Sequence, residues 1–194
     1  HAAGNVKLEL HDWNVDFAAW CGYKYLNSGP GGVSGIFVNE KHHGQSDIPR
    51  FEGWWGHDKE TRFKMPDEFI PIPTAEAWQL SNAPVLSMTP LLASLELFNK
   101  AGMDALRAKG DLLTGYLEFV ILEVAKATNV GLKIISPKDV ASRGSQISMV
   151  LPKDGKKVFD RLTESGVIAD WREPDVIRLA PVPLYNSFMD VFYF

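Results

Sequence analysis

Strand-like and helix-like segments alternate after Asn129, and this alternation limits the possible folds more than any other feature of the sequence. It predicts a helix over residues 156–165, ended by Gly166, and a last helix over residues 187–194. Hydrophobic runs also predict strands over residues 132–136, 146–151, 167–171 and 176–182. A chain that mixes the two element types in this way is expected to form a small α/β domain.

Two further helices are predicted before this domain. Thr89 can cap a helix whose first turn holds Pro90, and apolar residues then recur at helical spacing as far as Phe98. Gly102 is expected to interrupt the helical pattern. The apolar face of the second helix is made by Leu106, Leu113, Leu117, Val120 and Val124. We place a domain boundary just before this region, near Pro84.

The first third of the chain contains a turn signal and a long irregular stretch. Residues 6–26 are rich in aromatic and apolar side chains and stop abruptly at the glycine- and proline-rich residues 27–32. A short apolar strand is expected over residues 36–38. Residues 39–73 are polar and irregular, and they exceed the roughly 12–15 residues of an inert connection. A functional loop is therefore expected there.

Composition excludes several classes of function. Hydrophobic residues make up 45% of the chain and charged residues 23%, which is typical of a folded globular protein. The net charge of -4 gives no basic surface for phosphate groups, so nucleic acid is not an expected partner. No apolar run approaches the roughly 18 residues that span a bilayer, so no membrane partner is expected. Cys21 is the only cysteine, which excludes an internal disulfide and favours a reducing compartment.

Lys24 is the candidate for covalent chemistry. It stands in an aromatic run, where burial would disfavour the ammonium form and lower the pKa, so that the amine could form a Schiff base. Tyr23 offers a hydroxyl to a phosphate oxygen, and the following glycines would let the backbone approach a bound group. A lysine beside aromatic residues also commonly lays its stem on apolar surface with its charge in water. Both interpretations stay open from the residues alone.

Residues 20–32 resemble the cofactor-lysine segment of the kynureninases. Other stretches that match the same family, in the same order, are residues 53–57, 61–65, 80–84, 112–117, 143–146 and 177–188. The resemblance covers essentially the whole chain. It implies a fold-type-I pyridoxal 5'-phosphate (PLP) enzyme, with residues 1–83 ending the large PLP-binding domain and residues 84–194 forming a small C-terminal α/β domain.

The resemblance also implies an activity. Kynureninases hydrolyse L-kynurenine or 3-hydroxy-L-kynurenine to L-alanine and anthranilate or 3-hydroxyanthranilate, in tryptophan catabolism and NAD biosynthesis. The implied enzyme is a cytoplasmic homodimer with a shared active site. The chain begins at His1 without an initiator Met, so it is expected to be a piece of a longer protein. The N-terminal half of that protein would supply the aspartate that pairs with the pyridine nitrogen.

Five residues are assigned to the cofactor by the resemblance, and one of them, Asn82, is also assigned to the substrate. Lys24 matches the Schiff-base lysine, which also takes the α-proton of the substrate and returns protons. Tyr23 matches the residue that meets the cofactor phosphate and assists proton transfer. His1 matches a histidine close to the cofactor, and Trp54 matches a residue whose indole N–H reaches a phosphate oxygen.

Asn82 and Arg178 are assigned to the substrate. Asn82 matches a position that faces the cofactor and the aromatic ring of the substrate, where its amide could bind a 3-hydroxyl group and favour 3-hydroxykynurenine. The alternative is a loop asparagine that caps a turn before Pro84. Arg178 matches the arginine that holds the substrate α-carboxylate through two parallel bonds. The alternative is an outward-facing strand residue.

Other candidate residues receive no catalytic role. His42 and His43 are interpreted as solvated loop histidines without the spacing of a metal site, so no metal is expected. His57 is left without a role. Two alternative functions remain, another fold-type-I enzyme such as a cysteine desulfurase or an aminotransferase, and a non-catalytic fragment that completes a dimer. Cys21, three residues before Lys24, is wrongly placed for the mobile cysteine of a desulfurase.

Overall fold

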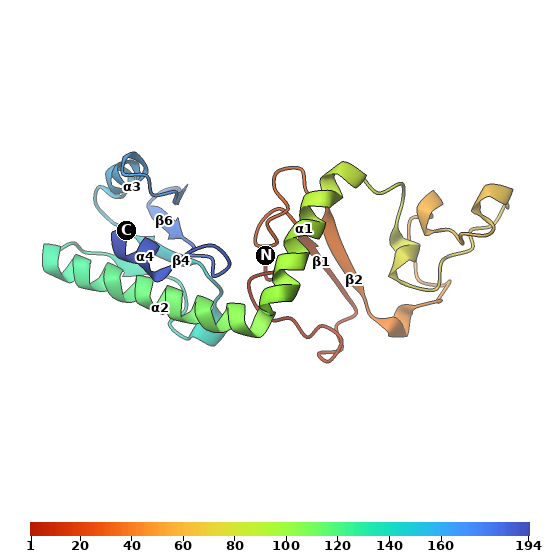
Figure 1. Ribbon diagram of the computed structural model, residues 1–194, viewed down its shortest axis with the longest axis horizontal. Coiled ribbons are helices and arrows are strands. Elements are labelled where there is room, and N and C mark those ends of the chain that lie inside the picture. Colours follow the sequence, from red (N-terminus) through yellow and green to blue (C-terminus); the bar gives the residue numbers. More distant parts are fainter. The chain divides into compact units, whose positions relative to one another are not determined.

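A glycine separates the two long helices of the chain. Gly102 has φ 78°, a backbone conformation that L side chains rarely adopt, and it stands between α1 (Val85–Ala101) and α2 (Met103–Thr128). The computed structural model describes residues 1–194, which form two units, His1–Lys100 and Ala101–Phe194 (Figure 1). The predicted interruption at Gly102 is confirmed. The domain boundary predicted before residue 84 lies directly ahead of α1 and stays a prediction.

The first unit is built on a hairpin followed by a long irregular segment. Strand β1 (Phe17–Cys21) pairs antiparallel with β2 (Ser34–Val38), and Cys21 lies opposite Ser34. This confirms the strand predicted at residues 36–38. The irregular character predicted for residues 39–73 is also confirmed. Its regular structure, with the turn that follows it, is limited to short 3-10 helices, η1 (Glu40–His42), η2 (Trp54–Gly56), η3 (Arg62–Lys64) and η4 (Ala75–Trp78).

Helix α1 begins one turn earlier than predicted. The carbonyl of Pro84 accepts a hydrogen bond from the N–H of Met88 at 3.1 Å, so the helix already starts at Val85. Thr89 lies inside the helix, and its hydroxyl donates to the Val85 carbonyl at 3.0 Å instead of capping the first turn. Pro90 is likewise an interior residue. The cap predicted at Thr89 was wrong because a serine or threonine hydroxyl can bind a carbonyl of the preceding turn as readily as it caps.

The second unit contains a four-stranded antiparallel sheet. Its strands are β3 (Lys133–Ile134), β4 (Ile147–Val150), β5 (Asp170–Arg172) and β6 (Val176–Leu179), in the spatial order β3-β4-β6-β5. The remaining helices are α3 (Gly155–Glu164) and α4 (Phe188–Tyr193). The predicted mixture of helices and strands is therefore confirmed, although all four strands are shorter than expected.

One face of this sheet and helix α2 form the core of the second unit. Leu113 and Leu117 on α2 are buried together with Ile147 on β4 and Ile177 on β6. Figure 1 shows α2 running alongside β4, β6 and α4. Val124, predicted to share this face, is 56% exposed, and Ile121 is buried in its place at 5% exposed. Helical spacing does not explain the difference, because Val124 lies on the same side of the helix as Leu113. The part of α2 that packs in the core ends at Ile121, and residues 122–124 are all exposed.

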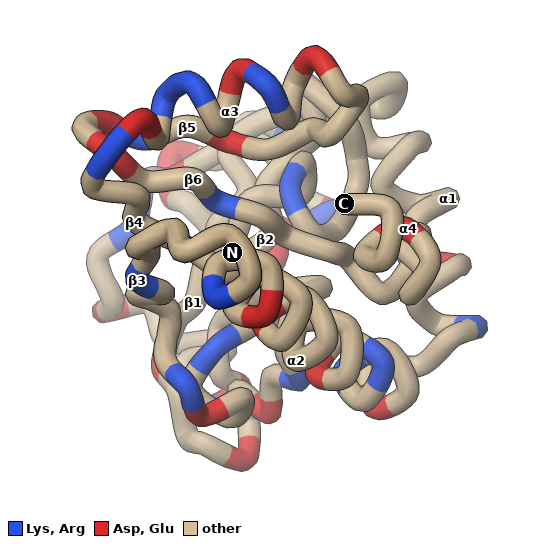
Figure 2. The backbone as a smooth tube through the Cα atoms, turned by 90° about the vertical axis from the view of Figure 1, so that its left-hand side faces the viewer, with Lys and Arg blue, Asp and Glu red and all other residues tan.

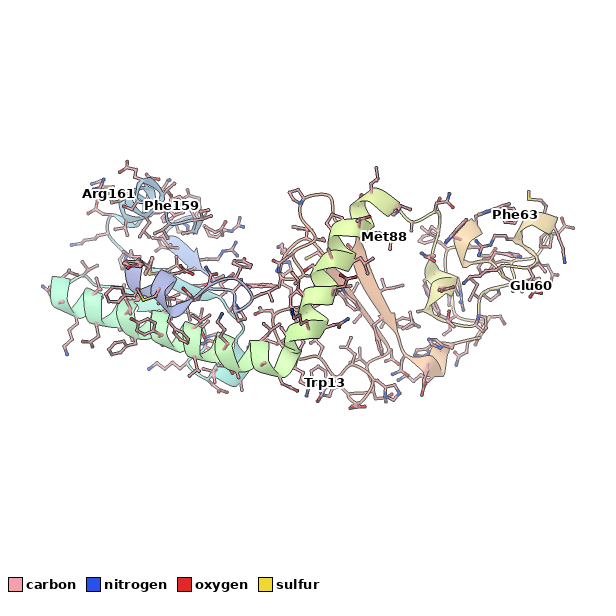
Figure 3. All side chains as sticks on the ribbon, in the orientation of Figure 1. Trp13, Glu60, Phe63, Met88, Phe159 and Arg161 are labelled. Carbon is pink, nitrogen blue, oxygen red and sulfur yellow. The ribbon has the colours of Figure 1, made fainter.

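Helix α3 covers the sheet with one face and presents charge on the other. Phe159, labelled in Figure 3, is partly buried against the core. Arg161, labelled beside it, has a side chain that is 79% exposed and pairs with Glu164 at 3.0 Å. Figure 2 shows basic and acidic positions following one another along this helix. Gly166, with φ 87°, follows the helix as predicted, and its N–H donates to the Thr163 carbonyl.

Leu113 tests this core. It is fully buried, so Leu113→Ala is expected to lower the free energy of unfolding by about 2–5 kcal/mol through lost burial and a residual cavity. The neighbouring Leu112 is 65% exposed, and Leu112→Ala is expected to cost less than about 0.5 kcal/mol. Urea unfolding of the two variants gives the comparison. Equal losses would mean that α2 does not present this face to the sheet.

Candidate active site

Lys24 lies just after β1, next to two other predicted site residues. Its Nζ atom is 3.5 Å from Nδ1 of His1 and 5.7 Å from the centre of the Tyr23 ring. Lys24 makes no salt bridge, so no carboxylate competes for its amine. The structure therefore places His1, which is 23 positions away in the sequence, next to Lys24 and its neighbour Tyr23.

The burial predicted for Lys24 is wrong within this chain. Lys24 is exposed, and the side chain of its neighbour Tyr23 is also exposed, at 51%. The reason is local, because β1 ends at Cys21 and the chain bends away before it reaches the lysine. Phe17 and Trp20 belong to the strand, and they do not enclose the amine of Lys24.

The turn after Lys24 is closed by tight backbone packing. A Cβ atom on Gly22 would lie 2.3 Å from the Val33 carbonyl oxygen, and one on Gly32 would lie 1.9 Å from the Ser28 hydroxyl. A side chain at position 22 would therefore require the backbone to shift, and one at position 32 would displace the Ser28 side chain. Hydrogen bonds from Asn27 N to Lys24 O at 2.9 Å and from Ser28 N to Gly22 O at 3.1 Å complete the turn. The glycines thus fix the segment that carries the lysine.

Trp54 lies in the segment that was expected to be a functional loop. It begins η2, its side chain is 44% exposed, and its ring packs edge-on to that of Phe63 at 5.7 Å. Phe63 is labelled in Figure 3 on η3. Trp54 also lines a cavity of about 240 Å³, together with His57 and Arg62. An exposed indole beside a cavity is available to a ligand.

Arg62 holds this segment in place, and sequence reasoning assigned it no role. It is only 5% exposed, and its Nη2 donates to the carbonyls of Trp55 at 3.1 Å and His57 at 2.9 Å. Its guanidinium also lies over the Trp55 ring at 4.5 Å. Arg62 lies within residues 61–65, one of the stretches that resemble the kynureninases. The sequence alone, however, does not distinguish a buried arginine that holds a loop from an arginine on the surface.

His57 is part of the same framework. Its Nδ1 accepts a hydrogen bond from Ile70 N at 3.4 Å, and its Nε2 lies 3.2 Å from the Thr61 hydroxyl. That hydroxyl donates to Asp58 at 2.8 Å, and this bond is the main reason that the pKa of the Asp58 carboxyl is lowered. His57 is buried at 8% exposed, so it supports the loop from within.

Asn82 lies in the extended stretch that leads into α1. It is exposed and makes no hydrogen bond within the chain. Asn82 therefore does not cap the turn before Pro84, which was the alternative role for this residue. Its amide donor and acceptor are both free, as the predicted contact with a substrate hydroxyl requires.

Arg178 belongs to the second unit and lies on β6. Asp170 stands opposite it on β5, and Arg178 Nε is 2.5 Å from Asp170 Oδ2. The side chain of Arg178 is 31% exposed, so a ligand can reach it. Sequence reasoning missed Asp170, although strands were predicted over residues 167–171 and 176–182, which carry Asp170 and Arg178.

The histidines after β2 are more ordered than predicted. His42 stacks on Phe17 with 5.0 Å between ring centres and lies 2.8 Å from Asp16 through its Nε2. Only 20% of its side chain is exposed, so the interpretation of His42 as a solvated loop residue was wrong. Lys41 also pairs with Asp16, at 2.7 Å, and these two partners lower the pKa of that carboxyl. No group of three or more His, Cys, Asp or Glu side chains forms a metal site.

Solved structures of similar shape define the class of fold. A cysteine desulfurase of Thermococcus onnurineus matches 99% of this chain and 48% of its own, with a TM-score of 0.71 and 16% identity. A cysteine desulfurase of Escherichia coli covers 100% of this chain and 47% of its own, with a TM-score of 0.73 and 17% identity. An alanine–glyoxylate aminotransferase of Nostoc sp. has a TM-score of 0.60 and 22% sequence identity, over 98% of this chain and 49% of its own length. The fold is that of fold-type-I PLP-dependent enzymes.

The sequence matches narrow this class to one family. Residues 106–194 match the family described as "Kynureninase C-terminal domain". Kynureninases of Flavobacterium johnsoniae and Christiangramia forsetii are 59% and 57% identical over all 194 residues, which is 46% of each relative. The kynureninase of Myxococcus xanthus is 53% identical and is covered to 45%. The chain is thus similar to kynureninases along its entire length, and it spans a little less than half the length of these curated relatives, as their C-terminal part.

The role of Arg62 as a clamp can be tested by proteolysis. Arg62→Met removes two hydrogen bonds from a charged donor, worth about 1.5–3 kcal/mol each, and should open residues 53–72 at least about tenfold more often. Tryptic cleavage after Lys64, followed by mass spectrometry, measures this opening. Lys59→Met is the control, because it removes only an exposed ion pair with Glu76. An unchanged cleavage rate in Arg62→Met would contradict the clamp.

Proposed function

We propose that this chain is the C-terminal part of an enzyme that hydrolyses L-kynurenine or 3-hydroxy-L-kynurenine with PLP as cofactor. The products would be L-alanine and anthranilate or 3-hydroxyanthranilate. The observation that carries the proposal is the 59% identity to a kynureninase over all 194 residues, so that every predicted site residue lies within the matched length. Because the chain spans 46% of that relative, the proposed activity belongs to a longer protein.

The residues of the chain fit the cofactor. Lys24 offers an exposed primary amine without a carboxylate partner, which is the group needed to hold an aldehyde covalently. Tyr23 offers an exposed hydroxyl and Trp54 an exposed indole, both suited to phosphate oxygens. When bound, PLP supplies an electron sink for bond cleavage next to the amino-acid carbon. Position and proton transfer are left to the protein.

Each predicted residue then has a task. The amine of Lys24, freed when the substrate binds, takes the proton from the α-carbon and later returns protons. His1 Nδ1, at 3.5 Å, is within reach of the proton on that amine. Arg178 binds the α-carboxylate as a fork of parallel N–H donors. Asn82 offers its free amide to the 3-hydroxyl of the substrate ring.

The alternative functions are weaker on structural grounds. Cys21 is the last residue of β1 and is held opposite Ser34, so it is not on a mobile loop as a desulfurase reaction would need. A non-catalytic fragment would give no reason for an amine that lacks a carboxylate partner and lies beside His1 and Tyr23. No helix in the structure has the length and apolar character needed to cross a membrane. We further propose the homodimer, the cytoplasmic location and the role in tryptophan catabolism and NAD biosynthesis that the family implies.

Borohydride reduction tests the cofactor assignment. In the full-length protein that contains this chain, reduction should leave one pyridoxyl group on Lys24, found by peptide mapping. Lys24→Arg keeps the positive charge but lacks the primary amine, so it should carry no adduct and should lose measurable turnover of kynurenine.

The matched control for this experiment is Lys41→Arg. The Lys41 amine is paired with Asp16 at 2.7 Å, so this variant should keep both the adduct and the activity. An adduct on a lysine other than Lys24, or full activity in Lys24→Arg, would overturn the assignment. A full-length protein without any adduct would favour the non-catalytic alternative.

Asn82 tests the substrate preference. Asn82→Ala should lower kcat/KM for 3-hydroxykynurenine about tenfold relative to kynurenine, because one hydrogen bond worth about 1 kcal/mol or slightly more is lost only with the hydroxylated substrate. Asn99→Ala, an exposed asparagine on α1, is the control and should leave the ratio unchanged. Equal losses for both substrates would show that Asn82 does not face the 3-position.

A further inference from the structure

The hairpin of β5 and β6 joins Arg178 to a carboxylate of its own chain. Asp170 and Arg178 are directly opposite each other in the register, so their side chains project from the same face of the sheet. This face is the one turned away from the core, since Ile177 and Leu179 point into the core on the other side. Both Nε and Nη2 of Arg178 contact Asp170 Oδ2.

These two contacts occupy only one edge of the guanidinium. A guanidinium has one edge formed by Nε and Nη2 and a second edge formed by its two terminal nitrogens, and either edge can hold a carboxylate. Asp170 takes the first edge of Arg178. Nη1, which belongs only to the second edge, makes no hydrogen bond within the chain. The edge that remains free has the geometry of a carboxylate site.

The charge around this pair is not balanced. Arg172 Nε also binds Asp170 Oδ2, at 3.0 Å, so two guanidinium groups share one carboxylate. On its other side Arg178 faces Ser148 of β4, a neutral residue whose hydroxyl accepts from Gln146 at 2.9 Å. One positive charge is therefore left over, which favours the binding of a further anion.

Exposure argues against a purely structural purpose for the pair. The side chains of Asp170 and Arg178 are 44% and 31% exposed, and ion pairs in such positions add little to folding stability. Loss of the pair should consequently leave the fold intact. What the pair does restrict is the orientation of a long side chain that would otherwise sample many rotamers in water.

We propose that Asp170 is the positioning residue of Arg178. It holds the Nε–Nη2 edge so that the edge with both terminal nitrogens is presented to the α-carboxylate of the substrate. The inference rests on the proposed function and deepens it. Because the carboxylate is bound in both the ground state and the transition state, loss of Asp170 acts on KM and leaves kcat nearly unchanged.

Kinetics of the full-length enzyme with L-kynurenine test the proposal. Asp170→Ala should raise KM about tenfold, with kcat within about twofold of the parent, as expected for a weakened hydrogen bond to a charged group. Asp170→Asn keeps an acceptor oxygen at the same place and should recover part of the loss. Arg161→Ala, which removes only an exposed ion pair with Glu164 on α3, is the control and should leave KM within about twofold.

A double-mutant cycle separates positioning from general damage. In an Arg178→Ala background, which itself should raise KM, adding Asp170→Ala should change KM no further, because the residue through which Asp170 acts is gone. An unchanged or lower KM in Asp170→Ala, or an equal further loss in the Arg178→Ala background, would overturn the positioning role. If Arg178→Ala leaves KM unchanged, or if the parent enzyme does not hydrolyse kynurenine, the proposed function fails instead.

Discussion

The place of Lys24 depends on how closely the chain crosses itself in the turn between β1 and β2. The backbone at Gly22 passes so near the Val33 carbonyl, and that at Gly32 so near Ser28, that a side chain at either point would force its neighbour to shift. This close approach fixes where β1 ends and hence the position of the turn that carries Lys24. The amine then reaches His1, which lies 23 positions earlier in the sequence. A site residue on a turn gains rigidity from such contacts and needs no regular secondary structure of its own.

Periodicity predicted the elements well, and it failed where a different contact decided the outcome. The strands and helices of the second unit follow from apolar spacing, because Leu113 and Ile177 must face one core. Val124 was misplaced because the buried part of α2 ends at Ile121, and apolar spacing along a helix does not show where its contact with a core stops. The burial of Lys24 was misjudged because neighbours in sequence are not neighbours in space once a strand ends. Asp170 became visible only when the β5–β6 register was known.

Three arginines show why residue type alone cannot locate a site. Arg62 is buried with two carbonyl partners, and the Arg143 side chain is 4% exposed and bound to Glu118 at 2.7 Å and the Pro137 carbonyl at 2.9 Å. In both, burial makes the partners necessary for folding, since an unpaired buried charge is costly. Arg178 differs, because it is reachable by solvent and keeps one edge of its guanidinium free. Availability to a ligand therefore depends on which donors the fold has left unused.

The same reasoning explains why the fold does not select the reaction. The backbone of this chain resembles those of enzymes named cysteine desulfurase and alanine–glyoxylate aminotransferase over nearly its entire length, at 16–22% identity. A shared backbone that holds the same cofactor leaves the choice of bond to side chains that orient the substrate. For an amino-acid substrate, the carboxylate is one fixed point about which the molecule can turn. In the role proposed for Arg178, Asp170 would set the angle of the arginine at that point, so a residue that need not touch the substrate would influence which bond is aligned for cleavage.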